Sequence, residues 1–228
     1  MNGFQPGTSL GSGDLLGSQA RVDVFNKYYL NNWFNLSQYL GAPGDTAALL
    51  NASDPLDFNT FRMRGAAWSF VRYLLDRFDD GSAAEAVRTR ALIASSNADS
   101  RDAISDVFGE PFDRLATQWS TMLVSADREE VTVPRELELP SYQIKEIFDS
   151  RIGLAVNPPS GGFPLRPLRK NLSRADTLVV SLFTATGLYI ELNSTQAGPG
   201  TRLELVRPGS GARLTENVEP RIQILRIR

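Results

Sequence analysis

The chain has 228 residues, of which 42% are hydrophobic and 22% charged, with a net charge of −2; this balance is typical of a globular protein and excludes a disordered chain. It contains no histidine and no cysteine, which excludes disulfides, thiolate metal sites and any mechanism that needs an imidazole or a thiol from this chain. No stretch approaches the ~20 apolar residues of a membrane span.

The charge is unevenly distributed, with −6 over residues 1–130 and +4 over residues 131–228. Such a split favours two domains. The second half is too weakly basic to predict nucleic-acid binding. Residues 1–16 lack the basic start of a signal peptide.

A first helix is predicted from Ser18 to Tyr39. Apolar residues recur there at steps of three or four: Val22, Phe25, Tyr29, Trp33, Leu36 and Leu40. The run Gly41–Gly44, which contains Pro43, ends this helix. The polar stretch Asn51–Asn59, with Pro55, is predicted as a loop.

The strongest helical signal in the chain runs from Phe61 to Phe78. One stripe comprises Phe61, Gly65, Trp68, Val71, Leu75 and Phe78, and a second comprises Met63, Ala67, Phe70 and Leu74. A helix that is apolar on two faces is expected to be buried between neighbours. Asp79, Asp80 and Gly81 are predicted to end it, with Gly81 as a left-handed cap.

Three further helices are predicted in the first half of the chain. Ser82 with Glu85 forms a capping box, and Asp99 caps a short helix that ends at Gly109. Pro111 is predicted in the first turn of the last helix. The apolar stripe of that helix comprises Phe112, Leu115, Trp119 and Met122.

The pattern changes after Asp127. Six prolines lie within residues 128–170, which are predicted to be a linker and wrapping segment. From Thr177 the apolar period becomes two, which indicates strands: Leu178, Val180 and Leu182; Leu188, Ile190 and Leu192; Leu203 and Leu205; Ile222 and Ile224. The expected fold class is therefore α+β, with a helical domain of about five helices (1–127), the proline-rich segment (128–170) and a small antiparallel β-sandwich-like domain (171–228).

Few residue patterns point to catalysis. Without histidine, a serine nucleophile needs Lys, Asp or Glu as its base, and Lys27, Lys145 and Lys170 occur in no Ser-x-x-Lys spacing. Paired carboxylates are the alternative, as in glycosidases, and Asp54 with Asp57 or Asp79 with Asp80 would be the candidates. Turn formation and helix termination explain the same residues without catalysis.

The sequence evidence for metal and anion sites is similarly weak. A calcium loop starting at Asp76 would need an oxygen ligand where Phe78 stands and a glutamate where Val87 stands, so the match fails. Arg72 lies in the buried helix, where it is either a buried ion pair or substrate-carboxylate anchor, or an (i, i+4) partner of Asp76. The basic run Arg166, Arg169, Lys170 and Arg174 is a solvated loop by default, and a contact to an anionic polymer otherwise. Four Asn-x-Ser/Thr triplets begin at Asn35, Asn51, Asn171 and Asn193, and we assign them no role.

Two segments together suggest a family. The run from Arg64 to Phe78, together with Phe108–Phe112 and Leu115–Trp119, resembles the region after the active site in hyicolysin-like bacterial zinc metallopeptidases, a branch of the gluzincins. The resemblance covers about residues 1–126, and the tail resembles the sandwich domains that close many secreted peptidases. The chemistry of the family rests on a His-Glu-x-x-His helix and a downstream glutamate, often in an Asn-Glu-Gly setting. Neither motif occurs in this chain.

The resemblance therefore gives this chain no catalytic, cofactor-binding or metal residue and no cofactor. It implies either a C-terminal piece of a longer peptidase or a degenerate relative that has lost the zinc. The function expected is that of a C-terminal, non-zinc-binding portion of a secreted metallopeptidase-like protein, inactive alone, in the extracellular space or the cell envelope. Its partner would be the missing N-terminal peptidase half or a second copy, and the stripe from Val22 to Trp33 would then lack part of its cover.

Two other functions stay open. The chain could be a stand-alone binding module for a cell-envelope or extracellular polymer, acting through the β domain, or a hydrolase built on a pair of carboxylates. Whether the chain is an enzyme is thus undecided by its sequence.

Overall fold

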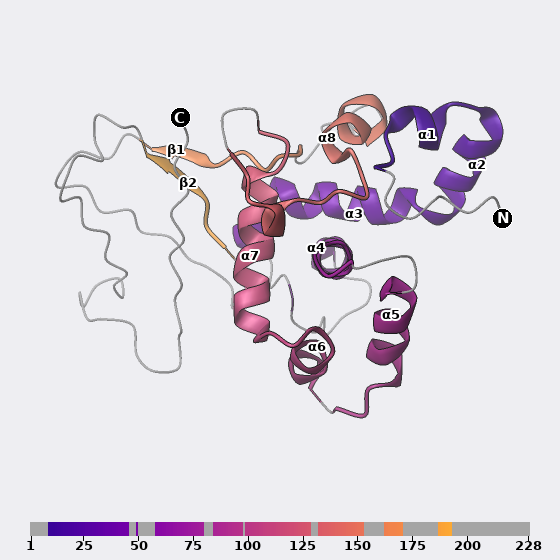
Figure 1. Ribbon diagram of the computed structural model, residues 1–228. Helices are drawn as coiled ribbons and strands as arrows, with labels where there is room; N and C mark the ends of the chain where they lie inside the picture. The colour runs from indigo at the N-terminus through magenta and orange to yellow at the C-terminus, as the bar shows by residue number, and fades with distance from the viewer. Residues whose placement is uncertain are drawn as a thin grey trace.

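A computed structural model of the chain describes residues 9–45, 49, 58–79, 84–97, 99–128, 132–152, 162–170 and 187–192. Helices dominate this part of the chain (Figure 1). In chain order the helices are α1 (Ser12–Leu16), α2 (Gln19–Tyr28), α3 (Leu30–Gly41), α4 (Phe58–Arg77), α5 (Ala84–Ala94), α6 (Ser100–Phe108), α7 (Phe112–Ser125) and α8 (Ile144–Ile147). Short helical turns occupy η1 (Pro43–Asp45), η2 (Arg135–Leu137) and η3 (Phe148–Ile152), and the strands are β1 (Leu168–Lys170) and β2 (Ile190–Leu192).

Helix α4 lies at the centre of the fold. Its predicted stripes are buried at Phe70, Leu74 and Leu75, whereas Phe61 and Val71 are exposed. Its closest neighbour is α3, and the two backbones approach most closely at Gly65. A Cβ atom at Gly65 would overlap the backbone of Asn35 and Leu36. Glycine is therefore required here by the close approach of two helices.

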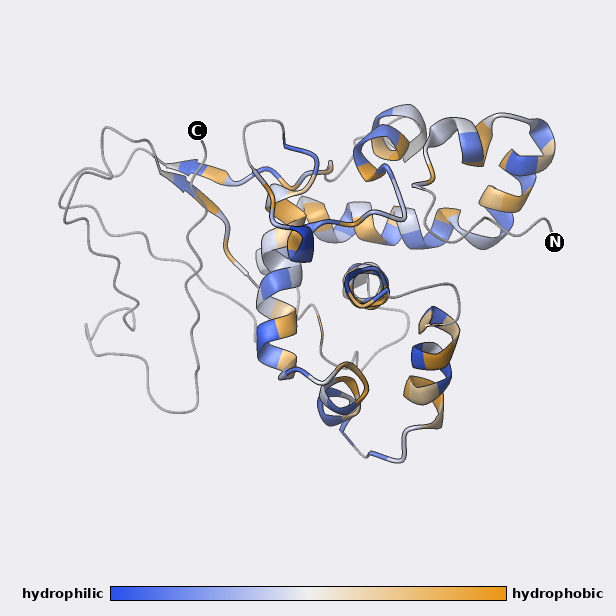
Figure 2. Cartoon of the chain, in the orientation of Figure 1, coloured by the Kyte–Doolittle hydropathy of each residue, from blue (hydrophilic) through white to orange (hydrophobic). Residues whose placement is uncertain are grey.

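Two groups of aromatic rings fill the core on either side of this contact. The Trp33 ring is fully buried and meets the rings of Trp68, Tyr142 and Phe148 edge-on, at centroid distances of 5.1, 5.2 and 5.9 Å. A second group surrounds Trp119: Tyr39 stacks on it at 5.8 Å, and Phe70 meets it edge-on at 5.6 Å. Such pairs stabilise a core beyond the area they bury. In Figure 2, each of the larger described helices carries hydrophobic residues together with hydrophilic ones, as expected for helices that pack on one side.

The predicted caps of α6 are present. Asp99 accepts a hydrogen bond from the backbone N–H of Arg101 at 2.8 Å, and Gly109 ends the helix in the left-handed region with φ of 70°. Pro111 is the N-cap of α7, one position before the first-turn place predicted for it. Gly81 and Ser82 lie outside the described residues, so their predicted capping roles stay predictions.

The proline-rich segment wraps the helical core as far as the structure describes it. Residues 132–152 pass over α4 and α7, and seven apolar side chains of this segment and the following stretch join the same hydrophobic core: Leu137, Leu139, Ile144, Ile147, Phe148, Phe163 and Leu165. We call residues 132–147 the strap. Backbone and side-chain hydrogen bonds attach it to α4, as described below.

The first predicted helix is two helices. The chain breaks between α2 and α3 at Tyr29, whose φ of −119° departs from the helical value, and its direction changes there (Figure 1). The sequence has neither proline nor glycine at this point, so periodicity could not reveal the break. The stripe that was expected to lack part of its cover is buried at Phe25 and Trp33, which are 1% and 0% exposed, and is half-buried at Val22 and Tyr29.

The prediction of an antiparallel β-sandwich was wrong. The strands that the structure describes, β1 and β2, pair in parallel, with Leu168 opposite Ile190 and Lys170 opposite Leu192. Alternation of apolar residues predicts a strand but not the direction of its partner. The chain between the two strands is longer than the dozen or so residues that a parallel connection needs. The other predicted strands, within 171–186 and 193–228, lie outside the described residues.

No helix among the described residues is both long enough and apolar enough to cross a bilayer. The predicted loop Asn51–Asn59 overlaps α4, which already begins at Phe58. The remainder of that loop is not among the described residues.

Candidate functional site

The polar side chains near the end of α4 form the densest hydrogen-bonded cluster of the described residues. The Arg72 Nε donates to Asp76 Oδ1 at 2.8 Å, and its Nη1 donates to Glu85 of α5 at 2.8 Å. Asp76 in turn accepts from Ser141 of the strap, from the backbone N–H at 3.0 Å and from the hydroxyl at 2.6 Å. Through Arg72, α4 is thereby joined to α5, and through Asp76 it is joined to the strap.

The charges of this cluster are largely shielded from water. The side chains of Arg72 and Asp76 are 15% and 2% exposed. Burial alone would lower the pKa of Arg72, but the hydrogen bonds and negative charges of Glu85 and Asp76 outweigh it, so the pKa is raised above its ordinary value. The guanidinium stays charged and its donors are engaged by carboxylates.

Of the two roles considered for Arg72, the structure bears out the ion pair. The (i, i+4) contact to Asp76 is present, and it is buried. An anchor for a substrate carboxylate needs guanidinium N–H groups directed toward a ligand, whereas Nε, Nη1 and Nη2 of Arg72 all donate to Asp76 or Glu85. The cluster is structural.

A second cluster one turn further on has the same character. Arg77 donates to Glu110 at 2.6 Å, and also to Gln118 of α7 and to the Tyr73 hydroxyl. The Tyr73 hydroxyl donates to the carbonyl of Glu136 at 2.5 Å, which fixes the strap to α4. Burial raises the pKa of Tyr73, so this donor keeps its proton over the ordinary pH range.

The described residues offer no group of three or more acidic side chains placed to hold a metal ion. Two of the acidic residues named from the sequence, Asp54 and Asp57, lie outside the described part of the chain, as does Asp80. The carboxylate-pair hypothesis therefore stays untested. Asp76, where the sequence match to a calcium loop already failed, is bound by Arg72 and Ser141 as described above.

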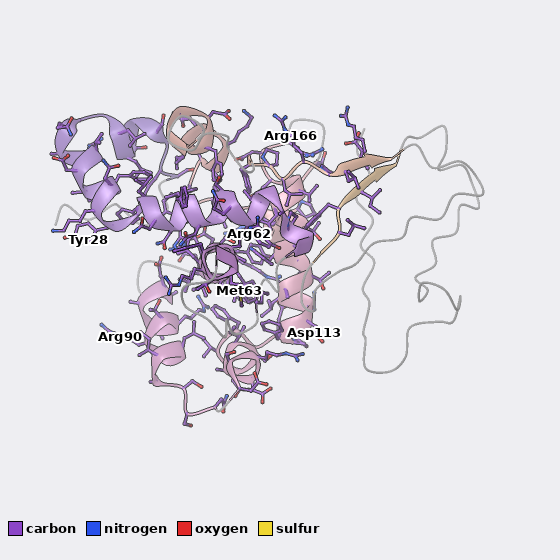
Figure 3. All side chains as sticks on the ribbon, turned by 180° about the vertical axis from the view of Figure 1, so that it is seen from behind. Tyr28, Arg62, Met63, Arg90, Asp113 and Arg166 are labelled. Atoms are coloured by element: carbon purple, nitrogen blue, oxygen red, sulfur yellow. The ribbon has the colours of Figure 1, made fainter. Side chains whose placement is uncertain are left out.

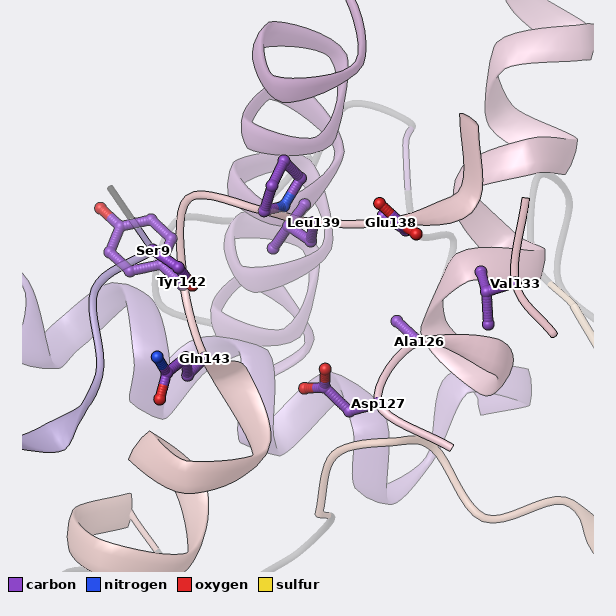
Figure 4. A pocket seen from close by; sticks show the side chains of 9 residues that line it. Ser9, Ala126, Asp127, Val133, Glu138, Leu139, Tyr142 and Gln143 are labelled. Carbon is purple, nitrogen blue, oxygen red and sulfur yellow. The ribbon is translucent and has the colours of Figure 1, made fainter. Parts of the chain in front are cut away.

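Two concave features adjoin the start of α8. A hollow of about 380 Å³ lies between the end of α7 and the strap, and a second of about 580 Å³ adjoins it. Figure 4 shows Glu138 and Leu139 on the extended segment above the first hollow, with Asp127 and Gln143 below. The lining of this hollow combines Ser9, Ala126, Asp127, Val133, Glu138, Leu139, Pro140, Tyr142 and Gln143.

Two residues of this lining, Asp127 and Tyr142, have unusual local environments. Asp127 has a positive φ of 58°, unusual for a residue other than glycine, and its carboxylate accepts from the backbone N–H of Lys145 at 3.3 Å. Burial raises the pKa of Tyr142 to about 12, so its hydroxyl is neutral at physiological pH. The lining of the hollow thus combines the carboxylates of Asp127 and Glu138 and the amide of Gln143 with apolar side chains such as Val133 and Leu139. Sequence reasoning did not find it, because its residues come from three irregular segments without a motif.

Tyrosines also join the strand pair to the helices. The Tyr189 hydroxyl, next to β2, lies 2.8 Å from Ser120 Oγ of α7. Burial raises the pKa of Tyr189 and of Tyr39, which also interact with each other. Both hydroxyls are neutral partners in a structural contact.

The remaining residues singled out in the sequence are dispersed. Arg169 on β1 forms an ion pair with Glu191 on β2 at 3.1 Å, which neutralises part of the predicted basic run, whereas Arg166 is exposed. Asn35 is 7% exposed in α3, so the folded core leaves no room for a glycan there. Lys145 pairs with Asp149. The structure brings none of these together in one site.

No family model matches the sequence, and neither a curated protein nor a solved structure shows significant similarity to it.

Proposed function

We propose that this chain is a non-catalytic helical portion of a metallopeptidase-like protein and is inactive as a peptidase by itself. The proposal rests on the resemblance of Arg64–Phe78 and Phe108–Trp119 to the region after the active site of gluzincin peptidases. Its location outside the cytoplasm is part of the same proposal and has the same support.

One observation supports the proposal most: the polar side chains of the resembling helix hold the fold together. Arg72, Asp76 and Arg77 of α4 each bind another segment of the chain, and Ser69 accepts a hydrogen bond from the Trp119 indole at 3.1 Å. Trp119 belongs to the second resembling segment. The two segments therefore form one core, and this supports a scaffold role for this part of the chain.

A peptidase assay with added zinc tests this proposal. The purified chain, incubated with casein and Zn²⁺, should release no peptides above the level of a heat-denatured sample. Adding a separately expressed segment that contains a His-Glu-x-x-His motif, encoded upstream in the same reading frame, should restore cleavage. Zinc-dependent cleavage by the chain alone would overturn the proposal.

A second candidate function is that of a binding module, and the hollow beside Tyr142 favours it. Its lining mixes apolar side chains with a few carboxylate and amide groups, as the lining of a small-ligand site does. Chemical-shift mapping with a panel of amines and sugars tests it: saturable shifts at Gln143 and Tyr142 that the Asp127→Asn, Glu138→Gln double variant abolishes would support it. Shifts scattered over the surface, unchanged in that variant, would contradict it.

A further inference from the structure

The N-terminal helices bury little for their length. Among the described side chains, α1 buries only Leu15 and α2 only Phe25, whereas α3 buries seven. The outer face of α2 presents Val24 and Tyr28, which are 48% and 61% exposed; Figure 3 shows Tyr28 at the edge of the molecule. A segment with so few buried apolar contacts is expected at the low-stability end of the fold.

One set of contacts fastens these helices to the strap. The Leu10 N–H donates to the Ser141 carbonyl at 2.9 Å, and the Gln143 N–H donates to the Leu10 carbonyl at 2.9 Å, which forms a parallel bridge. Ser12 Oγ donates to Glu146 Oε1 of α8. We call these three hydrogen bonds the latch.

The latch depends on a close approach at Gly11. A Cβ atom at Gly11 would lie 2.5 Å from Glu146 Oε2 and 2.8 Å from Gln143 Oε1. A side chain at Gly11 would therefore displace the ends of the Gln143 and Glu146 side chains, and Glu146 is the acceptor of the Ser12 bond of the latch. Gly13, two residues later on α1, has no atom within 4 Å of the place where its Cβ would stand.

The other end of this pair of helices is the break at Tyr29. At Tyr29 the φ of −119° interrupts the regular helix, which resumes as α3, and Trp33 and Leu36 of α3 are buried in the core. A break between a lightly packed helix and a firmly packed one is a natural hinge.

We propose that residues 12–28 form a lid that opens as a unit about Tyr29 when the latch releases, while α3, α4 and α7 stay folded. Opening separates Leu10 and Ser12 from their partners Ser141, Gln143 and Glu146 at the start of α8. The lid is thus a conformational device held closed by polar contacts. It is independent of the function proposed above.

Native-state hydrogen exchange on the full chain tests the lid. The amides of residues 22–28 should exchange at least 100-fold faster than those of α4 and α7, with a weak dependence on urea that marks local opening. Gly11→Leu should speed exchange of residues 22–28 by a further tenfold or more and leave α4 unchanged. The matched control Gly13→Leu should leave both rates within about twofold of the wild type.

Two results would overturn the lid. One is equal protection of residues 22–28 and α4 in the wild-type chain, with the same urea dependence. The other is a Gly11→Leu variant in which α2 and α4 exchange faster by the same factor, because that pattern reports global destabilisation. The wild-type comparison decides the matter even where the variant does not fold.

Discussion

Asp76 and Ser141 are 65 residues apart in the chain, and Ser141 donates to the Asp76 carboxylate through both its backbone N–H and its hydroxyl. The contact joins the strap to the central helix. It also gives the buried carboxylate hydrogen-bond donors beyond its partner Arg72, as a charge with 2% side-chain exposure requires. This relationship holds the Tyr142 side chain, one residue further on, against Trp33 and Trp68.

Asp76→Ala should lower the free energy of unfolding by about 3–5 kcal/mol, because it leaves the Arg72 charge without its most buried partner and the Ser141 N–H without an acceptor. Ser141→Ala should cost about 1–2 kcal/mol, since it removes only the hydroxyl. Urea unfolding followed by circular dichroism measures both values.

The double variant is the stringent form of this test. In the Asp76→Ala background, Ser141→Ala should cost less than about 0.5 kcal/mol, because the partner of its hydroxyl has already been removed. Asp149→Asn, at an exposed ion pair, is the control and should cost at most about 1 kcal/mol. Additive effects of Asp76→Ala and Ser141→Ala would mean that the contact does not hold the strap.

Gly65→Ala should destabilise the chain by about 3 kcal/mol or more, since the added methyl group meets the backbone of α3 and neither helix can yield without moving the core. Gly13→Ala is the matched control: it adds the same methyl group to a helix where there is open space, and should be neutral or stabilising by up to ~1 kcal/mol. Thermal unfolding of the two variants gives the comparison. Equal melting temperatures would show that α3 and α4 do not cross at Gly65.

Stability should fall as the pH rises from 10 toward 12. Burial raises the pKa of Tyr142 from 10.0 to about 12, so the folded chain keeps a proton that the unfolded chain loses in this range. The stability that the neutral Tyr142 hydroxyl gives the folded chain is fully present below pH 10 and is lost by about pH 12. For this residue the free energy of unfolding changes by about 2–3 kcal/mol. Urea unfolding at a series of pH values measures the slope.

Tyr142→Phe is the control for the alkaline transition. It should reduce the slope without removing it, because burial also raises the pKa values of Tyr39, Tyr73 and Tyr189. An unchanged slope in Tyr142→Phe would mean that the Tyr142 hydroxyl is not buried in the folded chain.

The central helix and the capped helix α6 could be predicted from the sequence because their signals are local. The double apolar stripe of α4 and the pair Asp99 and Gly109 need no knowledge of distant residues. The break at Tyr29 could not be predicted, because no local residue requires it and only the packing of Trp33 against α4 and the strap favours it. The parallel pairing of β1 and β2 depends on how the chain returns, which alternation does not encode.

The candidate sites, too, contain some features that local sequence predicts and others that depend on distant segments. The ion pair of Arg72 with Asp76 follows from their spacing on one helix and was predicted. The third and fourth members, Glu85 and Ser141, come from other elements and carried no signal. The hollow of Asp127 and Tyr142 likewise exists only once the strap has folded over α7.

Metal analysis of the purified chain tests the central claim most directly. After dialysis against micromolar Zn²⁺ and removal of free metal, inductively coupled plasma mass spectrometry should find well below 0.1 zinc per chain, as expected for a chain without histidine or cysteine ligands. One tightly held zinc per chain would contradict the account, because carboxylates and carbonyls alone would then have to form a metal centre, and the chain could no longer be regarded as a non-catalytic scaffold.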